Sequence, residues 1–122
     1  MTFQNTNVRI SDGCYINQNV FFDDGPQIVL GPNVSIGMGS YLLTGSHEVG
    51  GPERRAEGNP KAKVTVGAGS WLGARVIVMP GVTIGEGCII AAGSVVIADT
   101  KPHTMYAGIP AIPKKDLCAV TR

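Results

Sequence analysis

Aliphatic residues recur at every sixth position in the second half of the chain. Each of the following positions is Val, Ile or Leu: Val66, Leu72, Val78, Ile84, Ile90 and Val96. These three residue types make up only 29 of the 122 residues, so six consecutive matches point to an internal repeat. We call these positions anchors. The residues two positions earlier are small or aliphatic: Val64, Ser70, Val76, Val82, Cys88 and Ser94.

The first third of the chain carries the same pattern with one slip. The six-residue step runs through Ile10, Ile16 and Phe22. After a two-residue slip within residues 23–26, it continues through Leu30, Ile36 and Leu42. The residues two positions before these anchors are Val8, Cys14, Val20, Ile28, Val34 and Ser40. The two segments together provide twelve apolar anchors.

A period of six matches neither the 3.6-residue helix repeat nor the alternation of a long strand. It matches a strand of about four residues followed by a two-residue corner, as at Asp12-Gly13, Pro32-Asn33, Ala68-Gly69 and Glu86-Gly87. Three such sides close a triangular coil of about 18 residues, with the anchors pointing inward. The sequence therefore predicts an all-β, parallel β-helix of about four coils over residues 8–98, with Cys14 and Cys88 in its core.

The pattern stops between Leu42 and Val66. Residues 44–63 hold seven of the 19 charged residues, so they cannot line an apolar coil, and we expect a long protruding loop. Loops of this length in compact domains are usually functional or disordered. His47 lies at the base of this loop, where an imidazole could accept a proton from a hydroxyl near neutral pH. His103 follows the last anchor and is expected on the surface.

Composition narrows the class of protein further. The chain has 17 Gly and 8 Pro yet is 43% hydrophobic, a combination that fits short strands joined by tight corners. A net charge of +1 provides no electrostatic footprint for nucleic acid or an anionic membrane. No apolar run reaches the roughly 18–20 residues that span a bilayer. The length of 122 residues predicts a single domain over residues 1–122. Three cysteines without CxxC spacing, and an N-terminus without signal-peptide features, predict a cytoplasmic protein with reduced thiols.

An ordered set of short motifs spans residues 8–115. It comprises Tyr15-Ile16-Asn17, Asp23-Asp24, Leu30-Gly31-Pro32-Asn33-Val34, Thr44-Gly45-Ser46-His47, Trp71-Leu72-Gly73-Ala74, Pro80-Gly81-Val82-Thr83-Ile84-Gly85, Ala92-Gly93-Ser94-Val95-Val96 and Ala107-Gly108-Ile109-Pro110-Ala111. In this order the motifs make the chain resemble the hexapeptide-repeat acyltransferases, above all the maltose, galactoside and nodulation-factor sugar O-acetyltransferases and their polysaccharide relatives. The resemblance implies a left-handed β-helix with a C-terminal extension over residues 99–122.

The resemblance also implies a reaction. His47 would be the general base that deprotonates an acceptor hydroxyl, which attacks the thioester of acetyl-CoA by direct transfer, with no cysteine nucleophile and no metal. The acceptor would be a small molecule, most simply a saccharide, held near Asn17, Asp23 and Asp24. The family forms homotrimers with each active site between neighbouring subunits.

For the donor, the resemblance implies a groove between subunits that holds the pantetheine arm. Trp71, expected to face outward, would pack against the arm, and backbone groups near Gly73-Ala74 and Ala92-Gly93 would bind its amides. Small side chains suit positions where a ligand approaches the backbone closely. Lys114 and Lys115 fall near the position at which the family has a cation for the CoA phosphates.

The chain departs from the family pattern in three places. It begins only seven residues before the first coil position, where larger relatives carry a helical segment that helps enclose the acceptor. We therefore expect the neighbouring subunit to complete the site. Ile97-Ala98 replaces a polar-basic pair often found near the donor. Ala74 replaces a serine of some relatives, so any oxyanion stabilisation there must come from backbone N–H groups.

Three other functions deserve comparison. An acetyltransferase for an amino sugar, serine or a xenobiotic would use the same residues. A γ-type carbonic anhydrase on this fold needs three histidine ligands for zinc, and the chain has two histidines. A non-catalytic β-helix scaffold would need neither His47 nor an outward-facing Trp71.

Overall fold

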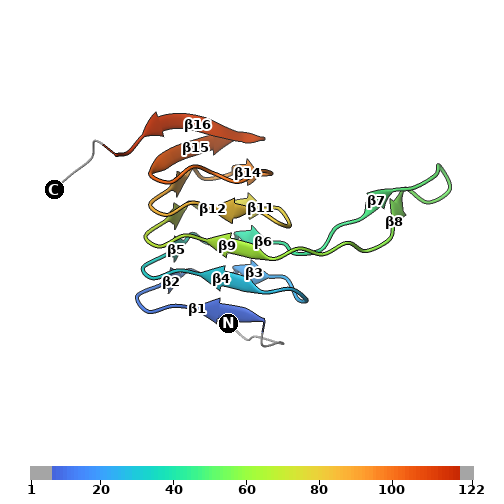
Figure 1. The fold of residues 1–122 in the computed structure, drawn as a ribbon, viewed down its shortest axis with the longest axis horizontal. Helices are drawn as coiled ribbons and strands as arrows, with labels where there is room; N and C mark the ends of the chain where they lie inside the picture. The colour runs from blue at the N-terminus through green and yellow to red at the C-terminus, as the bar shows by residue number, and fades with distance from the viewer. Residues whose placement is uncertain (1–6, 119–122) are drawn as a thin grey trace.

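The corners and anchors of the repeat wind the chain into a triangular prism (Figure 1). The computed structural model describes residues 7–118. The first two coils comprise β1 (Val8–Ile10), β2 (Tyr15–Ile16), β3 (Phe21–Phe22), β4 (Ile28–Leu30), β5 (Ser35–Ile36) and β6 (Tyr41–Leu42). The next two comprise β9 (Val64–Val66), β10 (Trp71–Leu72), β11 (Ile77–Val78), β12 (Thr83–Ile84), β13 (Ile89–Ile90) and β14 (Val95–Val96).

Three parallel sheets form the sides of the prism, and each is named here after its first strand. The β1 sheet is ordered β1-β4-β9-β12, and the β3 sheet is ordered β3-β6-β11-β14. The β2 sheet contains β2-β5-β10-β13 and continues beyond the fourth coil. Leu72 pairs with Ile90, 18 residues later, as the six-residue period predicts. The three in-register parallel sheets confirm the predicted all-β parallel β-helix and are consistent with the left-handed form that the resemblance implies.

The anchors form one buried aliphatic column, as predicted, except at its N-terminal end. Every anchor from Leu30 to Val96 is at most 1% exposed, and Cys88 is fully buried beside them. Ile10 is 41% exposed, so the expectation that it points into a closed core is wrong. The reason is that, among the described residues 7–118, β1 is the edge strand of its sheet and pairs only with β4. Cys14 is half-buried, packs against the core and donates its Sγ–H to the Gly31 carbonyl at 3.2 Å.

Three buried serines, Ser40, Ser70 and Ser94, lie two positions before anchors, and their hydroxyls form hydrogen bonds with backbone groups of the following turn of the chain. The Ser40 hydroxyl donates to the Gly73 carbonyl at 3.1 Å and accepts from the Val76 N–H at 3.1 Å. Ser70 likewise donates to the Gly85 carbonyl at 2.9 Å and accepts from the Cys88 N–H at 3.2 Å. The small side chain at this position therefore satisfies buried backbone groups of the next coil as well as fitting a narrow corner.

The β-helix continues past Val96, where the anchor pattern ends in the sequence. Thr100 bridges to Ile84, and Tyr106 pairs with Ile90, each 16 residues later instead of 18. Thr100 and Tyr106 are both buried, six residues apart. These residues begin a partial fifth turn in which β15 (Thr104–Gly108) joins the β2 sheet, and β16 (Ala111–Asp116) folds back antiparallel to it. The six-residue apolar pattern did not predict this turn, because the turn is two residues shorter than the others and because Thr100 is polar.

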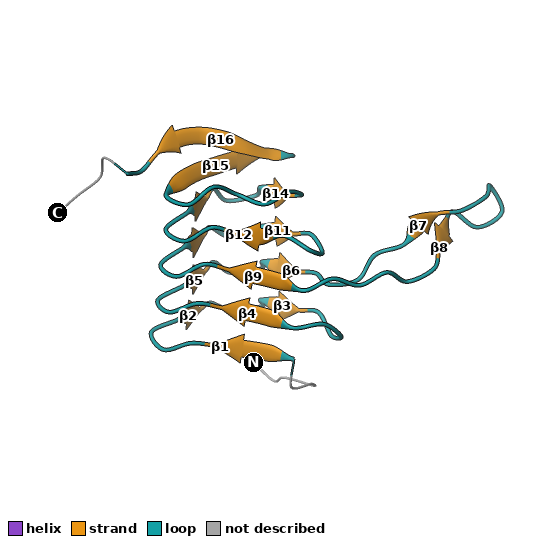
Figure 2. Cartoon of the chain, viewed as in Figure 1, coloured by secondary structure: helices purple, strands orange, loops and turns teal. Residues whose placement is uncertain are grey.

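The predicted protruding loop is an ordered two-stranded ribbon. Its outer part pairs β7 (Glu48–Val49) antiparallel to β8 (Ala56–Glu57), and its base is closed by a Gly45–Lys61 bridge. Figures 1 and 2 show the ribbon projecting well beyond the prism, between β6 and β9. Backbone hydrogen bonds along its length, such as Ser46 N–H to the Pro60 carbonyl at 3.1 Å, explain how so charged a segment keeps a defined shape.

The buried column predicts a steep cost for losing one anchor. Leu72→Ala, in the middle of the column, should lower the free energy of unfolding by about 2–5 kcal/mol because it leaves a cavity between coils. Urea denaturation followed by circular dichroism measures this change. Thr65→Ala, on an outward position of β9, is the matched control and should change stability by about 0.5 kcal/mol or less. Equal midpoints for the two variants would contradict the role of the column.

Candidate active site

Five of the predicted site residues lie along one edge of the prism. This edge, which we call the donor corner, is formed by the turns that join strands of the β2 sheet to strands of the β3 sheet. Backbone bonds stack these turns: Gly39 N–H to the Gln18 carbonyl at 3.0 Å, Arg75 N–H to Met38 at 2.9 Å, and Gly93 N–H to Ala74 at 2.9 Å. Along this corner the stack places Asn17, Gly73, Ala74, Ala92 and Gly93.

The two glycines of the donor corner are required for different reasons. A Cβ at Gly73 would lie 2.7 Å from the Ala92 nitrogen, so its small size is explained by coil stacking alone. Gly93 has φ of +77°, a conformation that favours glycine, and nothing lies within 4 Å of a Cβ built there. The corner at Gly93 and the exposed Ala92 therefore presents open backbone surface to a ligand.

Trp71 borders this corner from β10. Its side chain is 55% exposed, which confirms the expected outward orientation. Its strand neighbours at the same register are Ser35 and Ile89. A large indole exposed beside small corner residues is suited to packing against an extended, partly apolar ligand.

Lys114 and Lys115 lie on β16, at the C-terminal end of the β2 sheet. With Lys101 and Thr104 they line a cavity of about 490 Å³. Lys115 is opposite Met105, Met105 is opposite Ile89, and Ile89 is opposite Trp71. Three strand spacings of about 4.8 Å thus separate Trp71 from Lys115, roughly 14 Å. Lys101 was not predicted as a site residue, because only the partial fifth turn brings it beside the other two lysines.

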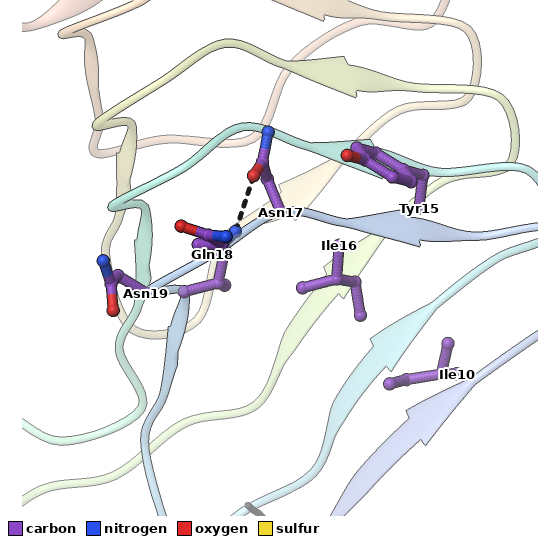
Figure 3. A pocket seen from close by; sticks show the side chains of 7 residues that line it. Ile10, Tyr15, Ile16, Asn17, Gln18 and Asn19 are labelled. Carbon is purple, nitrogen blue, oxygen red and sulfur yellow. Dashed lines mark hydrogen bonds between the residues drawn. The ribbon is translucent and has the colours of Figure 1, made fainter. Parts of the chain in front are cut away.

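Asn17 lines a larger cavity at the N-terminal end of the prism (Figure 3). The cavity measures about 620 Å³ and is lined by Ile10, Tyr15, Ile16, Asn17, Gln18, Asn19 and Val20. The Asn17 side-chain oxygen accepts a hydrogen bond from the Gln18 N–H at 2.7 Å, which holds the amide in place. The lining thus combines an aromatic ring and three amides with aliphatic surface.

His47 is held by the opposite limb of the ribbon. Its Nδ1 lies 2.7 Å from the Gly58 carbonyl oxygen, which can only accept a hydrogen bond. In the neutral imidazole Nδ1 therefore carries the proton, and Nε2 carries the free lone pair. The side chain is exposed to solvent. A rigidly held ring with an unprotonated, accessible Nε2 is the arrangement that a general base requires.

Asp23 and Asp24 lie in the first-coil turn, directly beside the base of the ribbon. We call this base, formed by Thr44, Gly45, Lys61 and Ala62, the root. Asp23 accepts hydrogen bonds from the backbone N–H groups of Thr44 at 3.0 Å and Gly45 at 3.2 Å. Asp24 is exposed, with its carboxylate 4.0 Å from the Lys61 ammonium. Both residues thus contact the ribbon that carries His47.

Within one chain, these two groups of residues lie apart. Asn17 and the donor corner lie where the β2 and β3 sheets meet, whereas the ribbon with His47 leaves the prism at the far edge of the β3 sheet. One side of the prism lies between them. The structure therefore brings Asp23, Asp24 and the ribbon together, but it does not bring His47 to the donor corner of its own chain.

The remaining candidate nucleophiles are unsuited to catalysis. Cys88 and Cys14 face the core, and the side-chain hydrogen bond with Asp116 raises the pKa of the Cys118 thiol, which disfavours the nucleophilic thiolate. His103 lies on the surface as expected, with Nε2 4.0 Å from Glu86.

Among residues 7–118 no group of three His, Cys, Asp or Glu side chains could hold a metal ion. That part of the chain also has no helix long and apolar enough to cross a bilayer.

Comparison with known proteins supports the same interpretation. Residues 63–98 match the family described as bacterial transferase hexapeptide (six repeats). A Staphylococcus aureus (strain MRSA252) protein whose name contains the word acetyltransferase is 44% identical over 105 residues, which cover 85% of this chain and 52% of that protein. The chain thus spans about half the length of the curated relatives it matches.

Solved structures are similar over a larger share of the chain. A hexapeptide-repeat-containing acetyltransferase from Vibrio cholerae, complexed with acetyl coenzyme A, has a TM-score of 0.86 and 35% identity over 91% of this chain and 61% of its own. A maltose O-acetyltransferase from Clostridium difficile 630 has a TM-score of 0.84 and 31% identity over 91% of this chain and 59% of its own. Together with the repeat and the stacked sheets, these similarities identify the chain as a hexapeptide-repeat β-helix that is similar to the acetyltransferases of that family.

Proposed function

We propose that this protein transfers the acetyl group of acetyl-CoA to a hydroxyl of a saccharide, with His47 as the general base. The observation that carries the proposal is the His47 imidazole, whose Nδ1 is held by the Gly58 carbonyl at 2.7 Å and whose Nε2 is left to accept a proton. The family supplies the donor chemistry, since a similar Vibrio cholerae acetyltransferase was solved with acetyl coenzyme A.

The proposed transfer is direct. Nε2 of His47 removes the proton from the acceptor hydroxyl while the hydroxyl oxygen attacks the thioester carbonyl carbon. The tetrahedral intermediate then expels the CoA sulfur, which takes the proton from the imidazolium, so the products are an acetyl ester and free CoA thiol. Most of the acceleration comes from holding the two substrates together and from the positioned base.

The donor would lie along the outer surface of the β2 sheet. Trp71 and the open backbone at Ala92-Gly93 would face the pantetheine arm. The lysines around the cavity at β16, Lys101, Lys114 and Lys115, would face the phosphates. The roughly 14 Å between Trp71 and Lys115 suits an extended arm that joins a thioester to a phosphorylated nucleotide.

The cavity beside Asn17 favours a saccharide among the possible acceptors. Its lining offers amide groups from Asn17, Gln18 and Asn19 and the exposed ring of Tyr15. Amides can both donate to and accept from sugar hydroxyls. The similar Clostridium difficile structure is a maltose O-acetyltransferase. Amino sugars, serine and xenobiotic hydroxyls are the competing acceptors, and a screen with acetyl-CoA that measures released thiol distinguishes them.

Assembly into a homotrimer would unite the separated residues. The outward residues of the β3 sheet are all aromatic or aliphatic, in register from Phe21 to Tyr41, Ile77 and Val95. The β2 sheet presents Tyr15, Trp71, Ile89 and Met105, with Ser35 between Tyr15 and Trp71. By contrast, Arg9, Thr65 and Thr83 dominate the outer face of the β1 sheet. Two apolar faces on one prism suit a closed ring in which each subunit contacts two others, so that His47 of one chain reaches the donor corner of the next.

Removal of the base tests the proposed reaction. His47→Ala should lower kcat about 10²–10⁴-fold, while the KM for acetyl-CoA changes by no more than about twofold, because the imidazole acts only on the acceptor proton. Thiol release from acetyl-CoA with saccharide acceptors is the measurement. His103→Ala, the other histidine, is the matched control and should keep wild-type activity. Full activity in His47→Ala would refute the proposal.

Trp71 provides a direct test of the donor surface, because it is the chain's only tryptophan. Titration with CoA should change its intrinsic fluorescence, since the arm would exclude water from the exposed indole. CoA at about 100 times its Kd should also stabilise the fold by about 2.7 kcal/mol. Absence of both the fluorescence change and the thermal shift would favour a non-catalytic scaffold.

The apolar β3 face predicts how assembly is disrupted. Ile77→Glu places a charge at the centre of that face and should convert a trimer into monomers with little acetyl-transfer activity, as measured by sedimentation velocity and thiol release. Thr65→Glu, a charge at an outward position of the β1 sheet, should leave both properties unchanged. A wild-type monomer with full activity would contradict the trimer.

A further inference from the structure

The carboxylate of Asp23 is almost fully used by backbone N–H groups. Its Oδ1 accepts from the Asp24 N–H at 2.9 Å, and its Oδ2 accepts from the N–H groups of Thr44 at 3.0 Å and Gly45 at 3.2 Å. Thr44 and Gly45 are the first two residues of the ribbon. Asp23 therefore joins the first coil to the point where the ribbon leaves the second coil.

Further contacts fasten both limbs of the ribbon at the same turn. The buried Thr44 hydroxyl donates to the Asp24 carbonyl at 2.6 Å, and the Thr44 carbonyl accepts from the Ala62 N–H at 2.9 Å. On the returning limb, the Lys61 ammonium lies 4.0 Å from the Asp24 carboxylate. The root is thus held by groups from the first coil, the outgoing limb and the returning limb.

A short ladder connects this root to His47. Gly45 bridges to Lys61, the Ser46 N–H donates to the Pro60 carbonyl at 3.1 Å, and the His47 Nδ1 donates to the Gly58 carbonyl at 2.7 Å. Each rung joins the two limbs, so a change in direction at Gly45 is transmitted to the imidazole two residues later.

We propose that Asp23 is a positioning residue that sets the direction of the ribbon and thereby the position of the His47 Nε2. This assignment rests on the proposed function, and it gives Asp23 and Asp24 different roles. Asp24, whose side chain is 74% exposed, is the carboxylate left to meet an acceptor. The prediction from the family resemblance that both aspartates bind the acceptor is thereby narrowed to Asp24.

The chemistry of the carboxylate explains why an acid is needed. Hydrogen bonds from backbone N–H groups to an ionised carboxylate are roughly twice as strong as neutral ones. Asparagine at this position has one acceptor oxygen and an NH₂ group that only donates. Asp23→Asn would therefore turn a donor toward either Asp24 or the Thr44–Gly45 pair and loosen the root.

The first test separates positioning from acceptor binding by steady-state kinetics. Asp23→Asn should lower kcat by about tenfold or more with both KM values nearly unchanged, because a displaced base slows the reaction without removing a binding contact. Asp24→Asn should instead raise the acceptor KM. Asp99→Asn is the matched control, since Asp99 accepts from the Thr83 N–H at 2.8 Å in a turn of the upper coils, away from the ribbon root, and should retain wild-type kinetics.

The second test needs no activity. Nitrogen-15 NMR of the wild type should show His47 protonated at Nδ1, whereas Asp23→Asn should show a mixture of tautomers. Exchange of the Gly45 amide hydrogen should be about tenfold faster or more in that variant. Asp99→Asn should change neither signal. If the wild type acetylates no acceptor, the proposed function fails, while these spectra still decide whether Asp23 positions His47.

Two results would overturn the assignment. One is an Asp23→Asn variant with wild-type kcat and an unchanged His47 spectrum, and the other is a rise in acceptor KM at constant kcat, which would make Asp23 an acceptor ligand. Thermal melts come first. If Asp23→Asn does not fold, Asp23→Glu keeps the charge but displaces the oxygens by one methylene, and it should show the same fall in kcat at constant KM.

Discussion

Stacking of one coil on the next is the constraint on which the rest of this molecule depends. No coil can bury its three anchors alone, because each inward side chain also needs the coils above and below to cover it. The backbones approach so closely that a Cβ at Gly73 would lie 2.7 Å from the Ala92 nitrogen. Buried hydroxyls such as Ser70, bonded to Gly85 and Cys88, keep the same spacing where the backbone turns.

That constraint also explains how a long charged ribbon is tolerated. Leu42 and Val66 are consecutive anchors separated by 24 residues, yet both keep their places in the column. The chain leaves and returns at neighbouring points, as the Thr44–Ala62 bond shows, so the coils stay in register. Since the entropic cost of closing a loop grows only slowly with its length, the prism tolerates the excursion as long as its root is held.

The sequence allowed the fold to be predicted in detail wherever burial alone decides the structure. Val66 and Leu72 report their inward orientation through a local rule, the six-residue step, and they are fully buried. The rule failed at Ile10, where no strand of the described part of the chain pairs on the outer side of β1, and beyond Val96, where the turn is shortened. Lys101 was not predicted as a site residue because it lies in that shortened turn.

The site was predictable in its residue types but less so in their roles. His47 stands out as a lone histidine at the base of a polar insertion, and Trp71 as a lone indole beside an anchor. The partners of Asp23 do not stand out, because its oxygens bind residues 21 and 22 positions later in the chain. Which nitrogen of His47 is free likewise depends on Gly58, across the ribbon. Such pairings arise from tertiary geometry and leave no periodic trace in the sequence.

The geometry of the prism gives the proposed chemistry its shape. The residues proposed to bind the donor lie where the β2 and β3 sheets meet, and that edge exposes backbone at Gly93 and a neighbouring indole. The base is carried away from that edge by a ribbon rooted across the β3 sheet. A rigid column cannot fold one edge onto another, so the proposed mechanism requires base and donor to meet between copies of the chain. Under this mechanism, the root at Asp23 matters because it aims His47 at a neighbouring molecule rather than at its own.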